Sequence, residues 1–255
     1  MNCKRYHTLL LPLLFLLTVG TGCSTTTGKS VASSPAAPVA SIEEGLRLSQ
    51  QRNYESAIEH FRGFIENNPL SRHAVEAQLH LADTLYEKGD YEDGAAYYTD
   101  FVTLHPAHPK APYALFKKGM CSLKESLSID RDPTATKKAI LAFDSLIASY
   151  PSSIYSDKAK KLRLFLNNRL AAREYSIGTF YFKKKNYHAA LKRFLRVIKD
   201  YPGSEITDSA LFHGGKSYIE IGERERGNEM LASLVDRYPY SSYTDRARRL
   251  LQNGG

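Results

Sequence analysis

A motif anchored on proline occurs five times along this 255-residue chain and constrains its fold more than any other feature. Apolar residues precede each proline by four and by eight positions, a small residue precedes it by twelve, and an alanine follows it by eight. Steps of four place side chains on one face of a helix. Because proline lacks a backbone N–H and disfavours helix in the residue before it, each proline should end its helix. The prolines are Pro69, Pro106, Pro151, Pro202 and Pro239, and the alanines are Ala77, Ala114, Ala159, Ala210 and Ala247.

A second helix is predicted after each proline, and the invariant alanine marks where it approaches its neighbour closely, since a larger side chain there would overpack. A second series of small residues occurs at Gly45, Ala82, Gly119, Gly178 and Gly215, mostly 37 residues apart. Serines after four prolines are suited to cap the second helix, namely Ser71, Ser153, Ser204 and Ser241. The unit resembles the tetratricopeptide repeat. We therefore predict an all-α solenoid of about five tetratricopeptide-like helix pairs whose inner face binds other molecules.

The spacing from Gly119 to Gly178 departs from the repeat and is 59 residues instead of 37. Eight extra residues fall in the polar stretch "LSIDRDPTAT", residues 127–136, for which a loop is predicted. Fourteen more fall between Pro151 and Gly178, where nothing breaks the helix. We expect one extended helix there, about four turns longer than its counterparts. The domains predicted from this are residues 42–135, with the N-terminal repeats and the insertion loop, and residues 136–255, with the long helix and the C-terminal repeats.

Residues 1–22 have the order of an export signal. Lys4 and Arg5 precede an apolar run that is too short to span a bilayer. The run "GTGC" ending at Cys23 resembles the lipobox of bacterial lipoproteins, although Gly20 stands where leucine is usual. The resemblance implies cleavage before Cys23 and acylation of Cys23, and the following Ser24 implies sorting to the outer membrane. The alternative is ordinary signal-peptidase cleavage with Cys23 as a bystander.

Residues 23–41 are predicted to form the acylated cysteine and a flexible tether. The segment after Cys23 is small, proline-containing and nearly uncharged, so it has too little apolar surface to fold. Its mean reach as a flexible coil is about 25 Å. Such a tether would hold a folded body just clear of a membrane surface.

Composition excludes some functions. The formal net charge is +8, but the basic residues are interspersed with acidic ones and form no aromatic-basic face, so nucleic-acid binding is not expected. The basic balance indicates a solvated surface, or else an acidic protein or lipid headgroup as partner. The three cysteines, Cys3, Cys23 and Cys121, suggest neither a disulfide nor a metal site. Cys121 is interpreted as a small core residue.

No pattern in the sequence indicates an enzyme, a metal or a cofactor. His105 and His108 lie in "HPAHP", a rigid turn with no carboxylate or cysteine close by in sequence. His73 and His80 share a helical face and are predicted to lie at the surface. The stretch "DRDP" at residues 130–133 is suited to order a loop by turn and cap contacts. There is no glycine-rich phosphate loop and no Ser/His/Asp motif.

Three longer stretches carry a more specific resemblance: "HPAHPKAPYALFKKG", "DRDPTATKKAILAFDSLIASYP", and "NRLAAREYSIGTFYFKKKNYHAALKRFLRVIKDYP". Together with the acylation signal and the spacing exceptions, they make residues 42–250 similar to the BamD family, the lipoproteins of the outer-membrane β-barrel assembly machinery. The resemblance implies a lipid-anchored scaffold at the periplasmic face of the outer membrane. It also implies binding to the POTRA domains of the barrel protein BamA, possible contacts with other Bam lipoproteins, and delivery of unfolded outer-membrane proteins. In the family the C-terminal repeats face BamA through a basic residue that matches Arg193, and the N-terminal repeats, around Tyr54 to Tyr98, face substrate.

Two other interpretations stay open. One is a different cell-envelope scaffold, either Tol-associated or secretin-assisting. Tol-associated chains of this kind place a coiled coil before their repeats, and residues 24–41 are too short and too rich in proline for one. The other is a periplasmic enzyme carried on helical repeats, against which the absence of a catalytic motif weighs.

Overall fold

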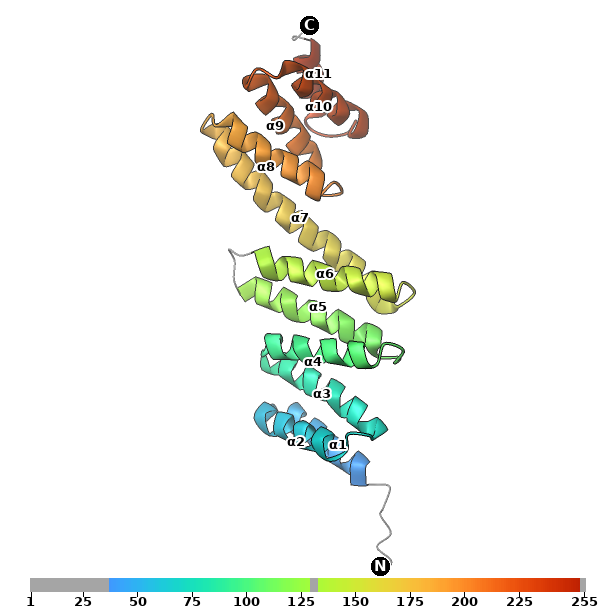
Figure 1. Ribbon diagram of the computed structural model, residues 1–255. Coiled ribbons are helices and arrows are strands. Elements are labelled where there is room, and N and C mark those ends of the chain that lie inside the picture. Colours follow the sequence, from blue (N-terminus) through green and yellow to red (C-terminus); the bar gives the residue numbers. More distant parts are fainter. Residues whose placement is uncertain (1–36, 129–132, 253–255) are drawn as a thin grey trace, which may run out of the picture. The chain divides into compact units, whose positions relative to one another are not determined.

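The computed structural model describes residues 37–128 and 133–252, and every regular element in those ranges is a helix (Figure 1). The described helices are α1 (Ala37–Gln50), α2 (Tyr54–Asn67), α3 (Arg72–Lys88), α4 (Tyr91–Leu104), α5 (Ala111–Ser128), α6 (Pro133–Ser149), α7 (Ile154–Lys183), α8 (Tyr187–Asp200), α9 (Thr207–Glu220), α10 (Arg224–Arg237) and α11 (Thr244–Gln252). Each packs against the helix before it and the helix after it. The predicted all-α solenoid of helix pairs is confirmed.

The repeated positions of the sequence form the core. The residue eight before each proline is fully buried in all five copies, and so is the alanine eight after it. The helices α2, α4, α6, α8 and α10 each end two residues before their proline, as expected. The buried side chains group into clusters that join consecutive helices, so each helix pair depends on its neighbours to bury its apolar face.

The small residues of the second series lie where the following helix packs a large side chain. A Cβ added to Gly178 of α7 would lie 2.6 Å from the Phe194 ring of α8, and one added to Gly119 of α5 would lie 2.5 Å from the Phe143 ring of α6. Neither distance is sterically possible without displacing the ring. Glycine is therefore required at these positions by packing between helices.

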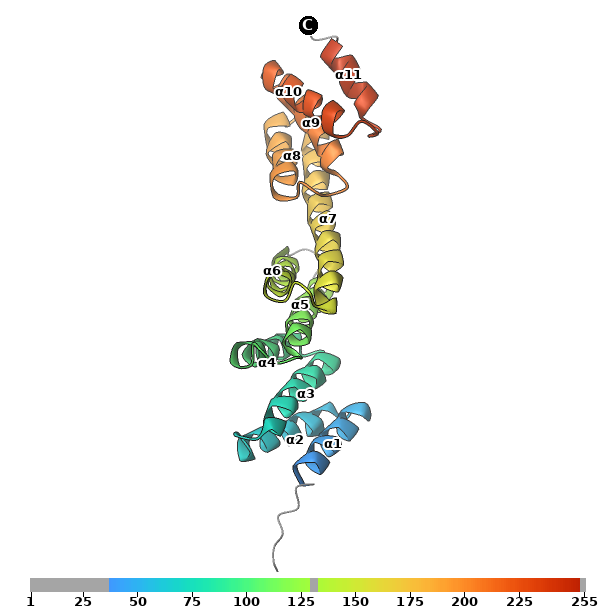
Figure 2. The same ribbon diagram turned by 90° about the vertical axis from the view of Figure 1, so that its right-hand side faces the viewer.

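The extended helix is α7, with 30 residues against 17 in α3 and 14 in α9, which confirms its predicted length. It packs against α5 and α6 and also against α8 and α9 (Figure 1; Figure 2). Arg163 in its first half forms an ion pair with Asp144 of α6 at 2.8 Å, and Asn168 bonds to Glu205 between α8 and α9. One continuous helix thus contacts both the repeats before it, through α5 and α6, and the repeats after it, through α8 and α9.

The loop predicted for residues 127–136 is wrong at both ends. Leu127 and Ser128 belong to α5, and α6 begins at Pro133, so the inserted residues mostly lengthen helices. Proline is well placed at the first position of a helix, because the N–H it lacks would have no partner there. Residues 129–132, which include Asp130, lie outside the described residues.

The tether predicted for residues 23–41 also ends too late, since α1 begins at Ala37. Pro38 lies in the first turn of α1, where the helix needs no hydrogen bond from it. The Ser41 carbonyl lies 2.6 Å from Nε2 of His60 in α2. The signal peptide and Cys23 lie outside the described residues, and the predicted division at residues 135 and 136 stays a prediction.

Two of the four predicted serine caps are confirmed. Ser71 and Ser153 accept hydrogen bonds from backbone N–H groups in the first turns of α3 and α7. Ser204 and Ser241 are not the cap residues, because α9 and α11 begin three residues later, at Thr207 and Thr244. The hydroxyl of Thr244 donates to the Tyr238 carbonyl at 2.7 Å. This hydrogen bond stabilises the turn between α10 and α11.

We predict that Gly178→Ala destabilises the protein by about 1–3 kcal/mol relative to Gly63→Ala. Gly63 lies inside α2 with no atom within 4 Å of an added Cβ, so both changes bring the same gain in helix propensity. Only Gly178→Ala pushes against a buried ring. Urea denaturation of the two variants measures the difference. Equal stabilities would show that the contact with Phe194 does not require glycine.

Candidate functional site

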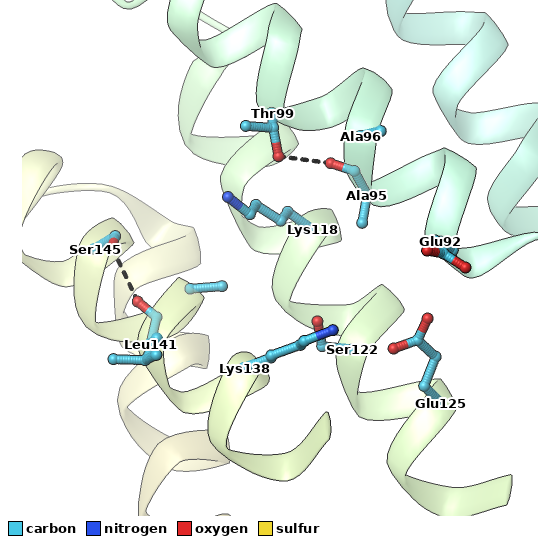
Figure 3. Close-up of a pocket in the computed structure, with 11 residues that line it drawn as sticks. Glu92, Ala95, Ala96, Thr99, Lys118, Ser122, Glu125, Lys138, Leu141 and Ser145 are labelled. Carbon is cyan, nitrogen blue, oxygen red and sulfur yellow. Dashed lines mark hydrogen bonds between the residues drawn. The ribbon is translucent and has the colours of Figure 1, made fainter. Parts of the chain in front are cut away.

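The groove between α4, α5 and α6 is one candidate binding surface, with a volume of about 380 Å³ (Figure 3). Its walls include the short side chains Ala95, Ala96 and Ala142, which leave room for an incoming main chain. Lys118 and Lys138 extend into the space from α5 and α6, and Glu92 and Glu125 supply carboxylates (Figure 3). The remaining lining residues are Thr99, Ser122, Leu141 and Ser145.

Groups of both charges and an exposed leucine line this groove. Leu141 is 66% exposed, although it lies on the helix that buries Phe143 completely. Thr99 and Ser145 donate to carbonyls in their own helices, Ala95 and Leu141, so their hydroxyls are used locally. The arrangement suits reversible contact with a peptide more than covalent chemistry.

A carboxylate inside the N-terminal repeats ties three helices together. Asp83 of α3 accepts hydrogen bonds from the hydroxyls of Tyr98 in α4 and Tyr113 in α5, the second at 2.7 Å. Burial raises the pKa of both tyrosines, and the charge of Asp83 raises it further. Tyr98 is fully buried. Tyr98 therefore cannot contact a substrate. The substrate-facing surface predicted around Tyr54 to Tyr98 does not include Tyr98 itself.

Arg193 is engaged within the fold. Its guanidinium donates to Glu174 of α7 at 2.9 Å, and Arg196, one turn further along α8, approaches the same carboxylate at 3.3 Å. Glu174 is nearly buried, while the side chains of Arg193 and Arg196 keep 33% and 50% of their surface exposed. Two cations on one carboxylate leave a net positive charge at the surface.

The electrostatics of this cluster favour the charged state of Glu174. Burial by itself would raise the pKa of the Glu174 carboxyl, but the hydrogen bond from Arg193 and the charges of both arginines outweigh it, so the pKa is lowered. Arg193 thus joins α8 to α7 besides presenting charge to solvent. Whether it contacts a partner stays a prediction.

Charge is unevenly divided along the described chain. Residues 37–128 contain nine Lys and Arg against thirteen Asp and Glu, whereas residues 154–252 contain twenty against eleven. The net charge of +8 is therefore the sum of an acidic part, residues 37–128, a basic part, residues 154–252, and the remaining residues. An acidic partner is attracted to the C-terminal repeats, which include Arg193.

His80 and Cys121 are packing residues. His80 stacks on Phe61 with ring centroids 5.9 Å apart, and burial lowers its pKa. The surface position predicted for His80 is therefore wrong, whereas His73 is half-buried beside the exposed Glu76 and keeps a partial surface position. Cys121 is fully buried, and burial raises the pKa of its thiol to about 12, which confirms its place in the core.

In residues 37–128 and 133–252 no three His, Cys, Asp or Glu side chains are grouped so that they could hold a metal ion. Nor does any helix there have the length and apolar character needed to cross a membrane.

The sequence predicts Arg193 as a site residue, which stays a prediction, and gives no direct sign of the residues around it. Nor does it reveal the groove of α4–α6, although Leu141 lies off the apolar stripe of α6 and could have indicated it. Glu174 was missed because it is 19 positions from Arg193 and only the packing of α7 on α8 brings them together.

Comparisons with known proteins agree on one family. The YfiO family model, described as outer membrane lipoprotein, matches residues 38–232. A protein of Rickettsia prowazekii named outer membrane protein assembly factor BamD is 30% identical over 96% of this chain and 97% of the relative. A protein of Caulobacter vibrioides with the same name is 29% identical over 80% of this chain and 67% of its own length.

Among solved structures, the TPR2AB domain of yeast Sti1 in complex with pHSP90 aligns over 86% of this chain and 84% of its own. Its TM-score is 0.47 at 16% sequence identity.

We predict that Glu174→Gln lowers the free energy of unfolding at pH 7 by about 1–3 kcal/mol, because hydrogen bonds to a charged group are lost. The folded-state pKa of Glu174 lies below its unfolded value. The stabilisation is therefore complete above the unfolded pKa, about 4.3, and is lost as pH falls through the folded pKa.

Urea denaturation of both proteins at pH 7 and at pH 3 measures the effect, with Glu229→Gln on the exposed side of α10 as control. A difference in stability that is the same at both pH values would contradict the ion pairing of Glu174.

Proposed function

This chain belongs to the YfiO family of outer membrane lipoproteins, and on that premise we propose that it is a non-enzymatic scaffold in the assembly of outer-membrane proteins. The observation that carries the proposal is the extent of the match, because the Rickettsia assembly factor aligns over nearly its whole length. The solenoid supports it, since stacked helix pairs offer extended binding surfaces.

We further propose that the principal partner is a BamA-like barrel protein, bound through its periplasmic POTRA domains by the C-terminal repeats. The basic excess of residues 154–252 supports an acidic contact surface on that partner. Arg193 and Arg196 are held in place by Glu174, so little side-chain entropy is lost when they meet a carboxylate. Other Bam lipoproteins are possible additional partners.

Unfolded outer-membrane proteins are the proposed cargo. The groove of α4–α6 supports this role, because its alanine walls leave room for a main chain and its charged rim of Lys118, Lys138 and Glu125 supplies polar contacts. An extended peptide can lie in such a groove with its side chains on alternate sides.

The proposed location is the periplasmic face of the outer membrane, with the chain held by acyl groups on Cys23. The sequence around Cys23 and the family membership support this. Several acyl chains hold a protein stably at a membrane, whereas one holds it only marginally.

The function is tested by co-purification. The chain carries a tag after Gly255, the cell envelope is solubilised mildly, and partners are identified by mass spectrometry. An outer-membrane barrel protein with POTRA domains as the main partner supports the proposal. Tol components or a secretin in its place would move the function to another envelope scaffold.

We predict that Arg193→Glu weakens capture of the barrel protein about tenfold or more, since it reverses a charge at the contact. That single change also repels Glu174. The double variant Arg193→Glu with Glu174→Arg restores the pair inside the fold but not the charge presented at position 193. Capture that stays weak in the double variant supports partner contact. Capture that recovers fully would reduce Arg193 to a structural role, and Lys184→Glu controls for general loss of charge.

We predict that Cys23→Ser moves the protein from the membrane fraction to the periplasmic extract, because the acylated thiol is absent. Fractionation followed by carbonate washing measures this. If the variant stayed in the washed membranes, the lipid-anchor proposal would fail, while the scaffold fold would be unaffected.

A further inference from the structure

In the regular repeats, the small residue of the second series is covered by the helix that follows. This small residue comes five positions after the alanine that follows the proline of the repeat. In α5 this is Gly119, five after Ala114, under the Phe143 ring of α6. In α9 it is Gly215, under Leu231 of α10. Each such position is therefore where the following helix packs.

In α7 the same position is left uncovered. Five residues after Ala159 comes Leu164, which is 52% exposed, and the next residue, Phe165, is 57% exposed. The glycine of this unit comes fourteen residues later, at Gly178, and α8 packs there through Phe194. The insertion has thus moved α8 along α7, away from the position at which a helix would have packed (Figure 1; Figure 2).

The exposed pair belongs to a longer stripe on α7, which we define as Lys161, Leu164, Phe165, Asn168 and Ala172. The spacing i, i+3, i+4, i+7 and i+11 places these side chains on one helix face. Lys161 and Ala172 are exposed as well, whereas Asn168 is half-buried and bonds to Glu205, which marks the end of the stripe nearest α8 and α9. On the other side of α7, Leu166 and Leu170 are buried, so the core does not need Leu164 or Phe165.

The charge around the stripe indicates what could cover it. Residues 158–173 contain six Lys and Arg and no Asp or Glu. Within the described chain Lys160 pairs with Asp157, and Arg163 pairs with Asp144 of α6. Lys161, on the stripe itself, is exposed. A basic surface around two apolar side chains is complementary to an amphipathic segment with acidic flanks.

We propose that the α7 stripe is a docking site for an acidic amphipathic helix of a partner protein, which packs where the repeat would have placed a helix of its own. The apolar side of that helix covers Leu164 and Phe165, and its acidic flanks face the exposed Lys158 and Lys161 and the net positive charge of residues 158–173. The stripe lies on a different face of α7 from Glu174, so this site is separate from the Arg193 cluster. The inference goes beyond the proposed scaffold function and is tested without the barrel protein.

The test uses two peptides taken from equivalent helices of this chain as labelled probes. Residues 53–68 carry three acidic and one basic side chain, and residues 186–201 carry one acidic and four basic side chains. Fluorescence anisotropy with the full chain in mild detergent measures their binding. We expect the acidic peptide to bind and the basic one to bind at least about tenfold more weakly. Equal binding of both would overturn the charge selection.

The variant Leu164→Gln with Phe165→Gln identifies the site. Both residues are exposed, so the fold should be retained, and circular dichroism checks this. We expect about a tenfold weaker affinity for the acidic peptide, since apolar contact is lost. Leu104→Gln, at a leucine 65% exposed at the end of α4, is the matched control and should bind normally. Unchanged binding in the double variant would overturn the proposal.

The occupant is tested by sedimentation. If the wild-type chain is a dimer and the double variant is a monomer, the stripe contacts a second copy of the chain, and the partner-helix proposal is wrong. The co-purification tests the proposed scaffold function, and peptide binding tests the docking site on α7. A failed capture of the barrel protein would not change the peptide result, so each proposal can fail without the other.

Discussion

The contact between a large side chain on one helix and a residue with almost no side chain on the helix before it determines this structure. The rings of Phe143 and Phe194 lie against Gly119 and Gly178 at distances that leave no space for a Cβ. Fully burying one such side chain stabilises by about 1.5–3 kcal/mol. Because each contact joins two consecutive helices only, stability accumulates along the chain from nearest neighbours. The surfaces away from these contacts are then left available for partners.

Most of the fold could be predicted from the sequence because these contacts require particular residue types at regular spacings. Small, aromatic and proline positions are fixed by packing, so their spacing indicates helix pairs and shows where a helix is extended. The ends of helices are less clearly indicated by the sequence. A loop is predicted for Leu127 and Pro133 because short polar stretches favour turns, yet both residues lie in helices. Ser204 and Ser241 have the residue type of caps, but the helices begin at the threonines three residues later, whose hydroxyls bond back into the turns.

The candidate surfaces were less predictable, because they depend on contacts between residues distant in sequence. Arg193 could be located by its family position, but its pairing with Glu174 depends on how α8 lies on α7. Tyr98 is an aromatic residue of the repeat, and nothing local shows that its hydroxyl bonds to Asp83 inside the fold. The groove of α4–α6 is assembled from three helices, so no single helix pattern contains it.

The length of α7 has a geometric consequence. Fourteen inserted residues turn the helix by about 1400°, which is within about 40° of four whole turns, and move its far end by about 21 Å. Ala159 and Gly178 are therefore about 100° apart around α7, close to the angle of about 140° between Ala114 and Gly119 in α5, so the insertion changes the relative direction of the two faces little. An insertion of twelve or sixteen residues would have rotated the later repeats by about 120° or 160° relative to the earlier ones. Descendants of this sequence can therefore vary the spacing between the two halves only in steps close to whole turns or heptads if the rotational phase of their binding surfaces is to be kept.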